Sequence, residues 1–164
     1  MVTPAFASEP PAARLTITTS RFGEAEQIVV PACALYTFPE TLPGLPDSRR
    51  YALIGDESSA PLFWLQSLEE GPVCLPMVEV QGLQVEGYAE QVSEALGAEP
   101  AAARVFVVTR FDPEHEGFIV NLLAPIVLDL DAGTGRQIIL EGQSFPLRRA
   151  VRWDAEARVF IAPC

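Results

Sequence analysis

The sequence predicts a mostly β, single-domain protein, with a bent antiparallel β-barrel-like fold and one short helix at about residues 87–96. Three observations predict it. Short segments with a two-residue hydrophobic period recur along the chain, turn-forming residues separate them, and only one stretch has helical spacing. The length of 164 residues suits one domain and is sufficient for a core without disulfide or metal support.

The N-terminal part divides into a leader and the start of the β domain. Residues 1–13 are rich in proline, alanine and small polar residues, so we expect a flexible leader. The β domain is expected over residues 14–150. Leu15 and Ile17 alternate with threonines, which predicts a half-buried strand, and Glu24 to Val30 resumes an extended pattern.

A rigid loop and three strands are expected next. The segment Phe38–Pro46 holds three prolines and a glycine, which exclude both a helix and a central strand. Extended segments follow at Tyr51–Ile54, Leu62–Ser67 and Val73–Val80. Because proline lacks a backbone N–H, Pro76 predicts that the last of these is an edge strand or contains a bulge.

The helix and the remaining hairpins complete the predicted order. Between Gly87 and Gly97, apolar side chains recur with helical spacing at Tyr88, Val92, Ala95 and Leu96. Two hairpins are expected after the helix: Arg104–Phe111 with Gly117–Leu123, and Ile126–Leu130 with Arg136–Glu141. Residues 151–164 form a C-terminal extension, in which Val151 to Ile161 is a candidate for one more hairpin.

The charge is strongly acidic and indicates which partners are favoured. There are 22 acidic residues against 11 basic ones, giving a net charge of -11, and every basic residue is arginine. Such a chain repels nucleic-acid phosphates and anionic lipid, so we expect no direct nucleic-acid partner and no membrane. The same field would accelerate encounters with a basic protein.

Cysteine usage and hydropathy favour a cytoplasmic protein. Cys33, Cys74 and Cys164 are odd in number and widely spaced, and with a single histidine they predict neither a disulfide framework nor a metal site. No export signal is recognised. The longest apolar run, Phe118 to Leu128, contains Asn121 and Pro125 and is too short to span a bilayer.

No catalytic constellation is recognised, so we expect no enzyme and no cofactor. His115 is flanked by two acids, which would suit a general base, but a solvated turn residue is the better interpretation. Neighbouring acids such as Glu69 and Glu70 are expected by chance in so acidic a chain. The sequence contains no nucleophile elbow, P-loop or dinucleotide-binding motif.

Large side chains near the loops are candidates for contact with a protein partner. Phe63 and Leu65 alternate with Trp64, and we expect one side of this strand to face outward. Asn121 interrupts an apolar run, so its amide must either fix the local backbone or meet a partner. The full predicted contact set is Phe63, Leu65, Gln66, Glu69, Glu70, Asn121, Leu123 and Pro125.

An ordered series of motifs carries a family resemblance. The motifs are Leu15-x-Ile17-x-Thr19-x-Arg21-Phe22-Gly23-Glu24, Phe38-Pro39, Leu42-Pro43-Gly44, Phe63-Trp64-Leu65-Gln66-Ser67, Val108-Thr109, Asn121-Leu122-x-Ala124-Pro125-Ile126-Val127, and Gln137 followed by Ile139-Leu140. Together they resemble the flagellar assembly factor FliW family over about residues 14–150. Each motif alone is weak, but the ordered set is specific.

The resemblance implies a bent β-barrel-like fold and a binding function. It implies that the protein binds and antagonises the basic translational regulator CsrA, through an allosteric effect, and that it also binds flagellin. Flagellin synthesis would thereby be coupled to filament assembly. The alternatives are a dedicated flagellin chaperone that does not bind CsrA, and an unrecognised enzyme.

Overall fold

The computed structural model describes residues 13–45, 47–69, 73–98, 100–114, 116–142 and 144–162. The predicted leader, apart from Ala13, therefore lies outside the described residues, as do Glu70, His115 and Cys164. The elements, in chain order, are β1 (Arg14–Thr19), β2 (Glu26–Pro31), a 3-10 turn (Ala32–Ala34), β3 (Leu35–Thr37), β4 (Arg50–Ile54), β5 (Leu62–Ser67), β6 (Cys74–Glu79), a 3-10 turn (Val80–Gly82), β7 (Leu83–Gln84), α1 (Tyr88–Leu96), β8 (Ala103–Asp112), β9 (Gly117–Val120), β10 (Ile126–Asp129), β11 (Thr134–Gln137), β12 (Arg149–Asp154) and β13 (Val159–Ile161).

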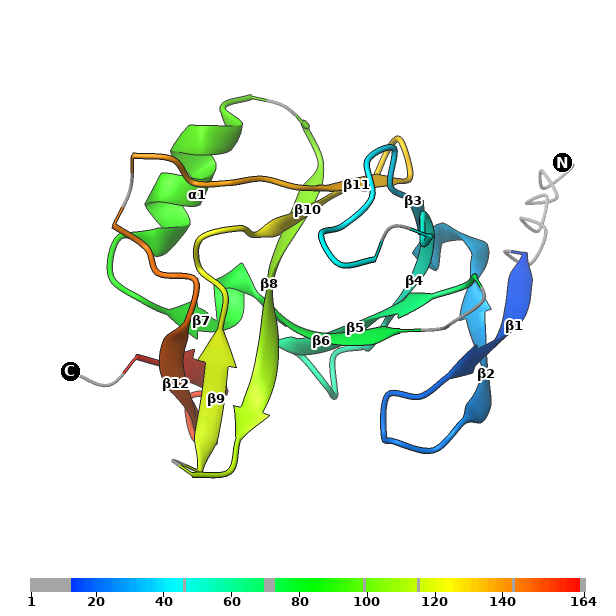
Figure 1. Cartoon of the computed structure of the whole chain (residues 1–164), viewed down its shortest axis with the longest axis horizontal. Helices are drawn as coiled ribbons and strands as arrows, with labels where there is room; N and C mark the ends of the chain where they lie inside the picture. Colours follow the sequence, from blue (N-terminus) through cyan, green and yellow to red (C-terminus); the bar gives the residue numbers. More distant parts are fainter. Residues whose placement is uncertain are drawn as a thin grey trace, which may run out of the picture.

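Seven strands pair in a closed ring. Their order is β10-β11-β3-β4-β5-β6-β8, and β10 pairs with β8 to return to the start. All of these pairs are antiparallel except β11 with β3, which meet in parallel through Thr134 and Thr37. The predicted strand-rich, bent, barrel-like fold with one helix is confirmed (Figure 1).

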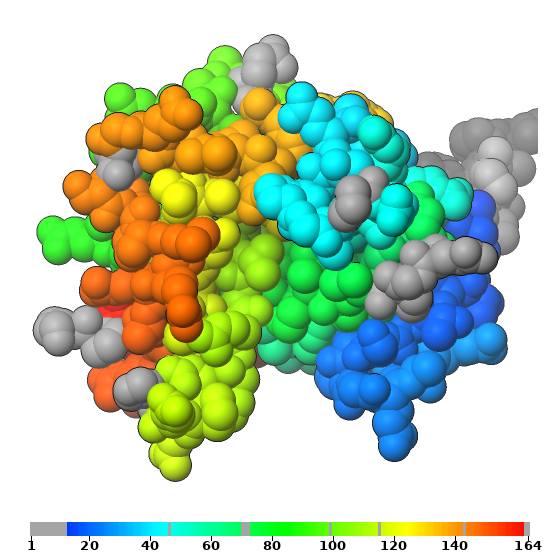
Figure 2. All heavy atoms as spheres, viewed as in Figure 1, coloured from blue at the N-terminus to red at the C-terminus, as the bar shows by residue number. Residues whose placement is uncertain are grey.

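Strand β8 also belongs to a second group of strands. Its last four residues pair with β9, and the order continues through β12 and β13 to β7. Helix α1 lies beside this group, at the upper left of Figure 1, whereas the β1–β2 hairpin lies at the opposite end of the molecule. The hairpin forms a separate projection at the lower right of Figure 2, with a notch between it and the β8–β9 hairpin.

Three hydrophobic cores follow from this arrangement. The ring encloses the first, which includes the fully buried Phe38, Tyr51 and Phe106. Side chains on the other face of β6 and β8, such as Val107, pack with α1 and the second group of strands around Tyr88. The third core lies between the β1–β2 hairpin and the outer face of β4 and β5.

The prediction that one side of Leu62–Ser67 faces outward is wrong, because both sides of β5 are covered. Phe63 and Leu65 point into the ring, where they are 4% and 0% exposed. Trp64 lies on the opposite face and packs with Ile17 and Val30 of the β1–β2 hairpin. A hairpin that folds back over a sheet converts a solvent-facing side into a second buried one.

The prediction for Pro76 is also wrong at the level of the strand, since β6 lies between β5 and β8. Its local environment nevertheless suits proline. Pro76 pairs with Trp64 of β5, but the pairing of β6 with β8 begins only at Met77. The strand therefore has an edge character at the position of the proline, although it is central one residue later.

The predicted hairpins after the helix are confirmed, but β8 is longer than predicted, β9 and β10 are shorter, and β11 begins two residues earlier and ends four residues earlier. Strand β8 pairs with β9, and β10 pairs with β11. Asp129 accepts hydrogen bonds at its Oδ1 from the backbone N–H of Asp131 and Ala132, at 3.1 and 3.0 Å, which shapes the β10–β11 turn. The two short parallel-paired strands, β3 and β7, have no counterpart among the predicted elements.

The C-terminal hairpin is integrated into the sheet on both sides. Strand β12 pairs with β9, and β13 pairs in parallel with β7. In its turn Arg158 has a positive φ of 55°. The Arg158 Nη2 donates to the carbonyl oxygens of Glu57, Ser58 and Ala60 at 3.2–3.3 Å, and so joins the hairpin to the β4–β5 loop.

Gly135 allows the β10–β11 hairpin to approach the core. A Cβ at this position would clash with Cζ of Phe38 and lie 2.9 Å from Cδ2 of Leu128. We therefore expect Gly135→Ala to lower the free energy of unfolding by about 1–3 kcal/mol through overpacking, measured by urea denaturation. Combining it with Phe38→Leu removes the clashing ring, so the double variant should lose less than the sum of the two single losses; strict additivity would contradict a steric origin.

Candidate protein-binding site

An apolar groove of about 460 Å³ lies where the ring meets the link between β9 and β10. One wall is the loop after β3, with Leu42 and Leu45, and the opposite wall carries Leu123 and Ile139. In Figure 2 the loop is cyan, the opposite wall is yellow and orange, and green atoms lie between them. The remaining lining residues are Pro43, Leu75, Val108, Asn121, Ala124, Ile126, Gln137 and Leu147.

Strand register explains why the β9–β10 link projects into this site. Val120 of β9 pairs with Thr109 of β8, and Ile126 of β10 pairs with Phe106 on the same strand. The chain thus advances six residues while its partner positions on β8 advance only three. The surplus residues must leave the ladder, as in a large bulge, and they form the turn that lines the groove.

Asn121 shapes this turn. Its backbone N–H donates to the Val108 carbonyl at 2.9 Å, which holds the start of the link on β8. Its Oδ1 accepts from the backbone N–H of Leu123 at 3.1 Å and of Ala124 at 3.2 Å. Of the two roles expected for the amide, the structure shows that it fixes the backbone. The Asn121 side chain is also partly exposed in the groove.

Neighbouring elements hold the rest of the turn. The Tyr88 hydroxyl of α1 donates to the Leu122 carbonyl at 2.9 Å, and burial raises the pKa of Tyr88, so this phenol stays protonated. The Gln137 Nε2 donates to the Ala124 carbonyl at 2.9 Å. The Leu140 N–H donates to the Leu123 carbonyl, also at 2.9 Å. The groove is therefore built on a largely preformed backbone.

The predicted contact residues lie in two environments. Asn121 and Leu123 line the groove, whereas Pro125 is buried and is not among the lining residues. Phe63, Leu65 and Gln66 lie within β5 and are buried, so their packing is explained without a partner. Contact of any of these residues with a partner stays a prediction.

Gln66 joins the β1–β2 hairpin to β5. It is fully buried, and its Oε1 accepts from the Ser20 N–H at 3.1 Å. Its Nε2 donates to the carbonyls of Ser67 and Val73 at 3.1 and 3.4 Å. All of its polar atoms therefore have partners within the fold.

Glu69 stabilises the start of β4. Its carboxylate accepts from the backbone N–H of Arg49 at 2.8 Å and of Arg50 at 3.2 Å, and it forms an ion pair with the Arg50 side chain at 3.4 Å. Desolvation acts to raise the pKa of Glu69, but these hydrogen bonds together outweigh it and lower the pKa. Part of the side chain stays exposed, at 24%.

Sequence reasoning missed the most exposed members of the groove. Ile139 and Leu147 are 62% and 56% exposed. A signal for Ile139 was present, because residues 138–140 are three consecutive apolar residues and an extended chain cannot bury them on one face. Leu147 lies in an irregular segment that has no periodicity to interpret.

The groove has the composition of a binding surface, with no cluster of reactive groups among its lining residues. Across the described parts of the chain, no group of three histidine, cysteine or acidic side chains is placed to hold a metal ion. Nor does the described part of the chain contain a helix with the length and apolar character needed to cross a membrane.

Comparisons with known proteins agree over most of the chain. The model of the FliW protein family matches residues 16–151. The flagellar assembly factor FliW of Thermotoga maritima is 30% identical over 128 residues, covering 75% of this chain and 86% of that protein. The factor of the same name from Bdellovibrio bacteriovorus is 28% identical over 153 residues, covering 91% of this chain and 86% of the relative.

A solved structure is similar in fold. The crystal structure of a flagellar assembly factor FliW aligns with a TM-score of 0.61 and 16% identity, covering 82% of this chain and 95% of the other. The family match at residues 16–151 includes every strand of the ring and every residue that lines the groove, but it ends before β13.

The two hydrogen bonds to the side-chain carbonyl of Asn121 lead to a prediction about stability. Replacing Asn121 with alanine leaves the N–H groups of Leu123 and Ala124 without this acceptor, and we expect a loss of about 0.5–2 kcal/mol in the free energy of unfolding. Asn121→Asp keeps an acceptor at the same position and should lose less. Urea denaturation measures both variants. Equal losses would contradict the proposed role of the acceptor.

Glu69 leads to a prediction about pH. Because folding lowers the pKa of Glu69, its stabilising effect is present above the unfolded pKa, near 4.5, and is lost as pH falls through the folded pKa. The difference in unfolding free energy between the parent chain and Glu69→Gln should therefore be constant near neutral pH and shrink below about pH 4.5. Urea denaturation across a pH series measures it. A difference that does not change with pH would contradict the assignment.

Proposed function

Since the chain belongs to the FliW family, we propose that it is a cytoplasmic flagellar assembly factor that acts by binding other proteins. Its partners are the translational regulator CsrA and flagellin. The family match over residues 16–151 is the observation that carries this proposal. The names of the similar proteins, which are flagellar assembly factors, support it.

The charge of the chain favours a basic partner such as CsrA. A net charge of -11 attracts a cationic protein at long range and repels RNA phosphates. Association driven in this way is fast at low salt and slows as salt screens the charges. A strong salt dependence of the association rate with CsrA is thus part of the proposal.

The groove supplies the short-range contacts. Ile139 and Leu147 expose apolar surface at its rim, and the hydrogen-bonded turn at Asn121 is already in place before a partner arrives. Apolar side chains around a preformed pocket are the usual energetic centre of a protein interface. We place the main contact with CsrA at this groove.

Antagonism of CsrA requires that the factor bind RNA-free CsrA more tightly than RNA-bound CsrA. We propose that the factor binds CsrA away from its RNA groove and lowers its RNA affinity allosterically. Linkage requires that RNA weaken the complex of the two proteins by the same factor. Flagellin would occupy the factor until export releases it, which couples flagellin synthesis to filament assembly.

Affinity measurements with both partners distinguish this proposal from the alternative. Isothermal titration of the purified chain with CsrA and, separately, with flagellin should show binding to each. Binding to flagellin alone would identify a dedicated flagellin chaperone. Binding to neither would contradict the proposed function.

A matched pair of leucine variants tests the groove. Leu147 lies at its rim, whereas Leu15 is an exposed leucine of β1 outside it, at 42% exposure. We expect Leu147→Ser to weaken CsrA binding about tenfold or more, and Leu15→Ser to leave the affinity almost unchanged. Thermal unfolding of both variants checks that the fold persists. Equal effects of the two substitutions would move the contact away from the groove.

A further inference from the structure

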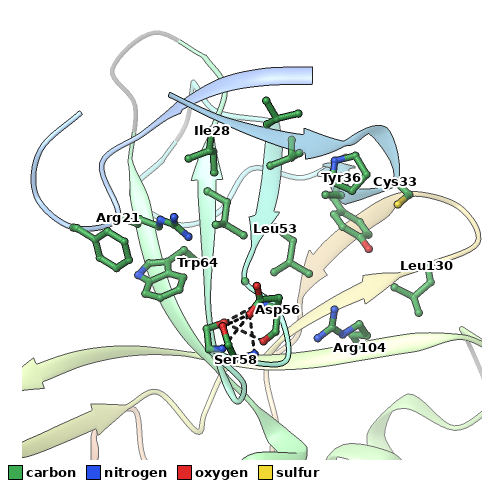
Figure 3. Close-up of a pocket in the computed structure, with 18 residues that line it drawn as sticks. Arg21, Ile28, Cys33, Tyr36, Leu53, Asp56, Ser58, Trp64, Arg104 and Leu130 are labelled. Atoms are coloured by element: carbon green, nitrogen blue, oxygen red, sulfur yellow. Dashed lines mark hydrogen bonds between the residues drawn. The ribbon is translucent and has the colours of Figure 1, made fainter. Parts of the chain in front are cut away.

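A second pocket, of about 770 Å³, lies beside the β1–β2 hairpin, next to the end of β4 and the start of β5. Figure 3 shows Leu53, Trp64 and Ile28 around its apolar part, with Arg21 at one end and Arg104 near the other. The residues that line this pocket belong neither to the predicted contact set nor to the groove. Its size is typical of pockets that bind a ligand or a short chain segment.

The pocket runs along an open strand edge. Four consecutive residues of β2, from Ile28 to Pro31, border it. Alternate side chains of a strand point to opposite faces, so a pocket bordered by all four must follow the edge of the strand. Among the described residues, β2 pairs with β1 and with no other strand.

The register shows which backbone groups this edge offers. Ala32 donates to the Ala13 carbonyl at 2.7 Å, and the β1–β2 pairing continues with Leu15 opposite Val30. Hydrogen-bonded pairs alternate with non-hydrogen-bonded pairs in an antiparallel ladder, so Val30 and Ile28 direct their backbone groups to β1. Val29 then directs its N–H and carbonyl away from β1, which is the arrangement that accepts an added strand.

The charged groups in the pocket favour an anionic ligand. Arg21 and Arg104 line it, against a single acidic residue, Asp56. The Asp56 Oδ1 accepts from the Ser58 hydroxyl and the N–H groups of Ser58 and Ser59, and these bonds, led by the Ser58 hydroxyl, lower the pKa of Asp56. The Asp56 carboxylate is thus already hydrogen-bonded within its own loop.

Both arginines are held in place by aromatic rings. The Arg21 guanidinium lies 4.6 Å from the ring centroid of Phe22 and 5.6 Å from that of Trp64. Arg104 lies 4.7 Å from the Phe63 centroid and pairs with Glu79 at 2.6 Å. Each guanidinium bonds one glutamate and has further N–H donors in its planar fork, which can bind a second carboxylate.

We propose that this pocket binds an extended, acidic and apolar peptide segment of a partner protein, added as a strand along β2. The Val29 backbone bonds the peptide main chain, Trp64 and Leu53 contact an apolar side chain, and Arg21 and Arg104 bind carboxylates. This peptide-binding proposal rests on the proposed function, because it takes the chain to be a protein that acts by binding other proteins. Although the whole chain is acidic, salt screens distant charges within about 8 Å. The guanidinium donors that Glu26 and Glu79 do not use are then the local groups that bind the carboxylates of the peptide.

Selection from a random octapeptide display library supplies the probe peptide. Selection on the parent chain, with counter-selection on the Arg21→Gln variant, should enrich peptides that combine aspartate or glutamate with apolar residues. Enrichment of neutral or basic peptides, or no enrichment, would overturn the proposal.

Affinity of the best acidic peptide then tests the geometry. In a Trp153→Phe background, fluorescence of Trp64 reports binding. We expect Arg21→Gln to weaken peptide binding about tenfold or more, and the double variant Glu79→Gln/Arg104→Gln to do the same. Glu79 is replaced together with Arg104 so that this glutamate is not left without its ion-pair partner. Arg152→Gln, an exposed arginine of β12, is the matched control and should have no effect.

Val29→Pro tests the strand edge. It removes the outward N–H but leaves the bonds of the β1–β2 ladder, so the hairpin should persist in thermal unfolding while peptide affinity falls about tenfold or more. Unchanged affinity in Val29→Pro or in both arginine variants would overturn the proposal. Titrations of CsrA and flagellin into the parent chain and the same variants distinguish a failure of this proposal from a failure of the proposed function. If the proposed function is wrong, the parent chain itself binds neither CsrA nor flagellin.

Discussion

Strand β8 is the constraint on which the rest of the structure depends. Over residues 103–106 it is bonded to β10 along one edge, and β6 joins the other edge at residues 106–108. Its alternate side chains supply two different cores, with Phe106 inside the ring and Val107 beneath the helix. Because β9 and β10 must share one edge of this strand, the residues between them have no place in the ladder. The groove is a direct product of that geometry.

The groove at the β9–β10 link and the pocket beside the β1–β2 hairpin differ in a way that suits different partners. The groove at the β9–β10 link is nearly all apolar and has a fixed backbone, whereas the pocket beside the β1–β2 hairpin combines aromatic walls with two arginines. The groove lies between the loop after β3 and the β9–β10 link, whereas the pocket lies beside the β1–β2 hairpin and the adjoining ends of β4 and β5. A factor of this size can therefore present two chemically distinct surfaces.

The periodic segments of the sequence predict the strands and the helix well, because side-chain alternation is a local property. Burial of a strand by elements that are distant in sequence is not a local property, and it explains the wrong predictions for β5 and Pro76. One side of β5 is expected to face outward, yet a hairpin from a distant part of the chain covers that side and buries Trp64 and Gln66. Pro76 suggests an edge strand because a sequence does not reveal that β8 starts its pairing at the next residue.

The candidate site is predictable only in part for the same reason. Asn121 is recognisable as an amide in an apolar run, and the structure shows the turn that it holds. Leu147 could not be found, because it reaches the groove from an irregular segment whose path depends on the pairing of β12 with β9. The short strands β3 and β7 are too brief for any period to be visible.

The closure of the ring has a mechanical consequence. Strands β3 and β11 meet at one residue pair, Thr37 and Thr134, so this seam has fewer paired residues than any other junction of the ring. The two walls of the groove continue from these same strands, with Leu42 after β3 and Ile139 after β11. Parting of the seam would spread these walls. Breathing motions at this joint would thus set the width of the opening that a docking protein encounters, at an energetic cost below that of global unfolding.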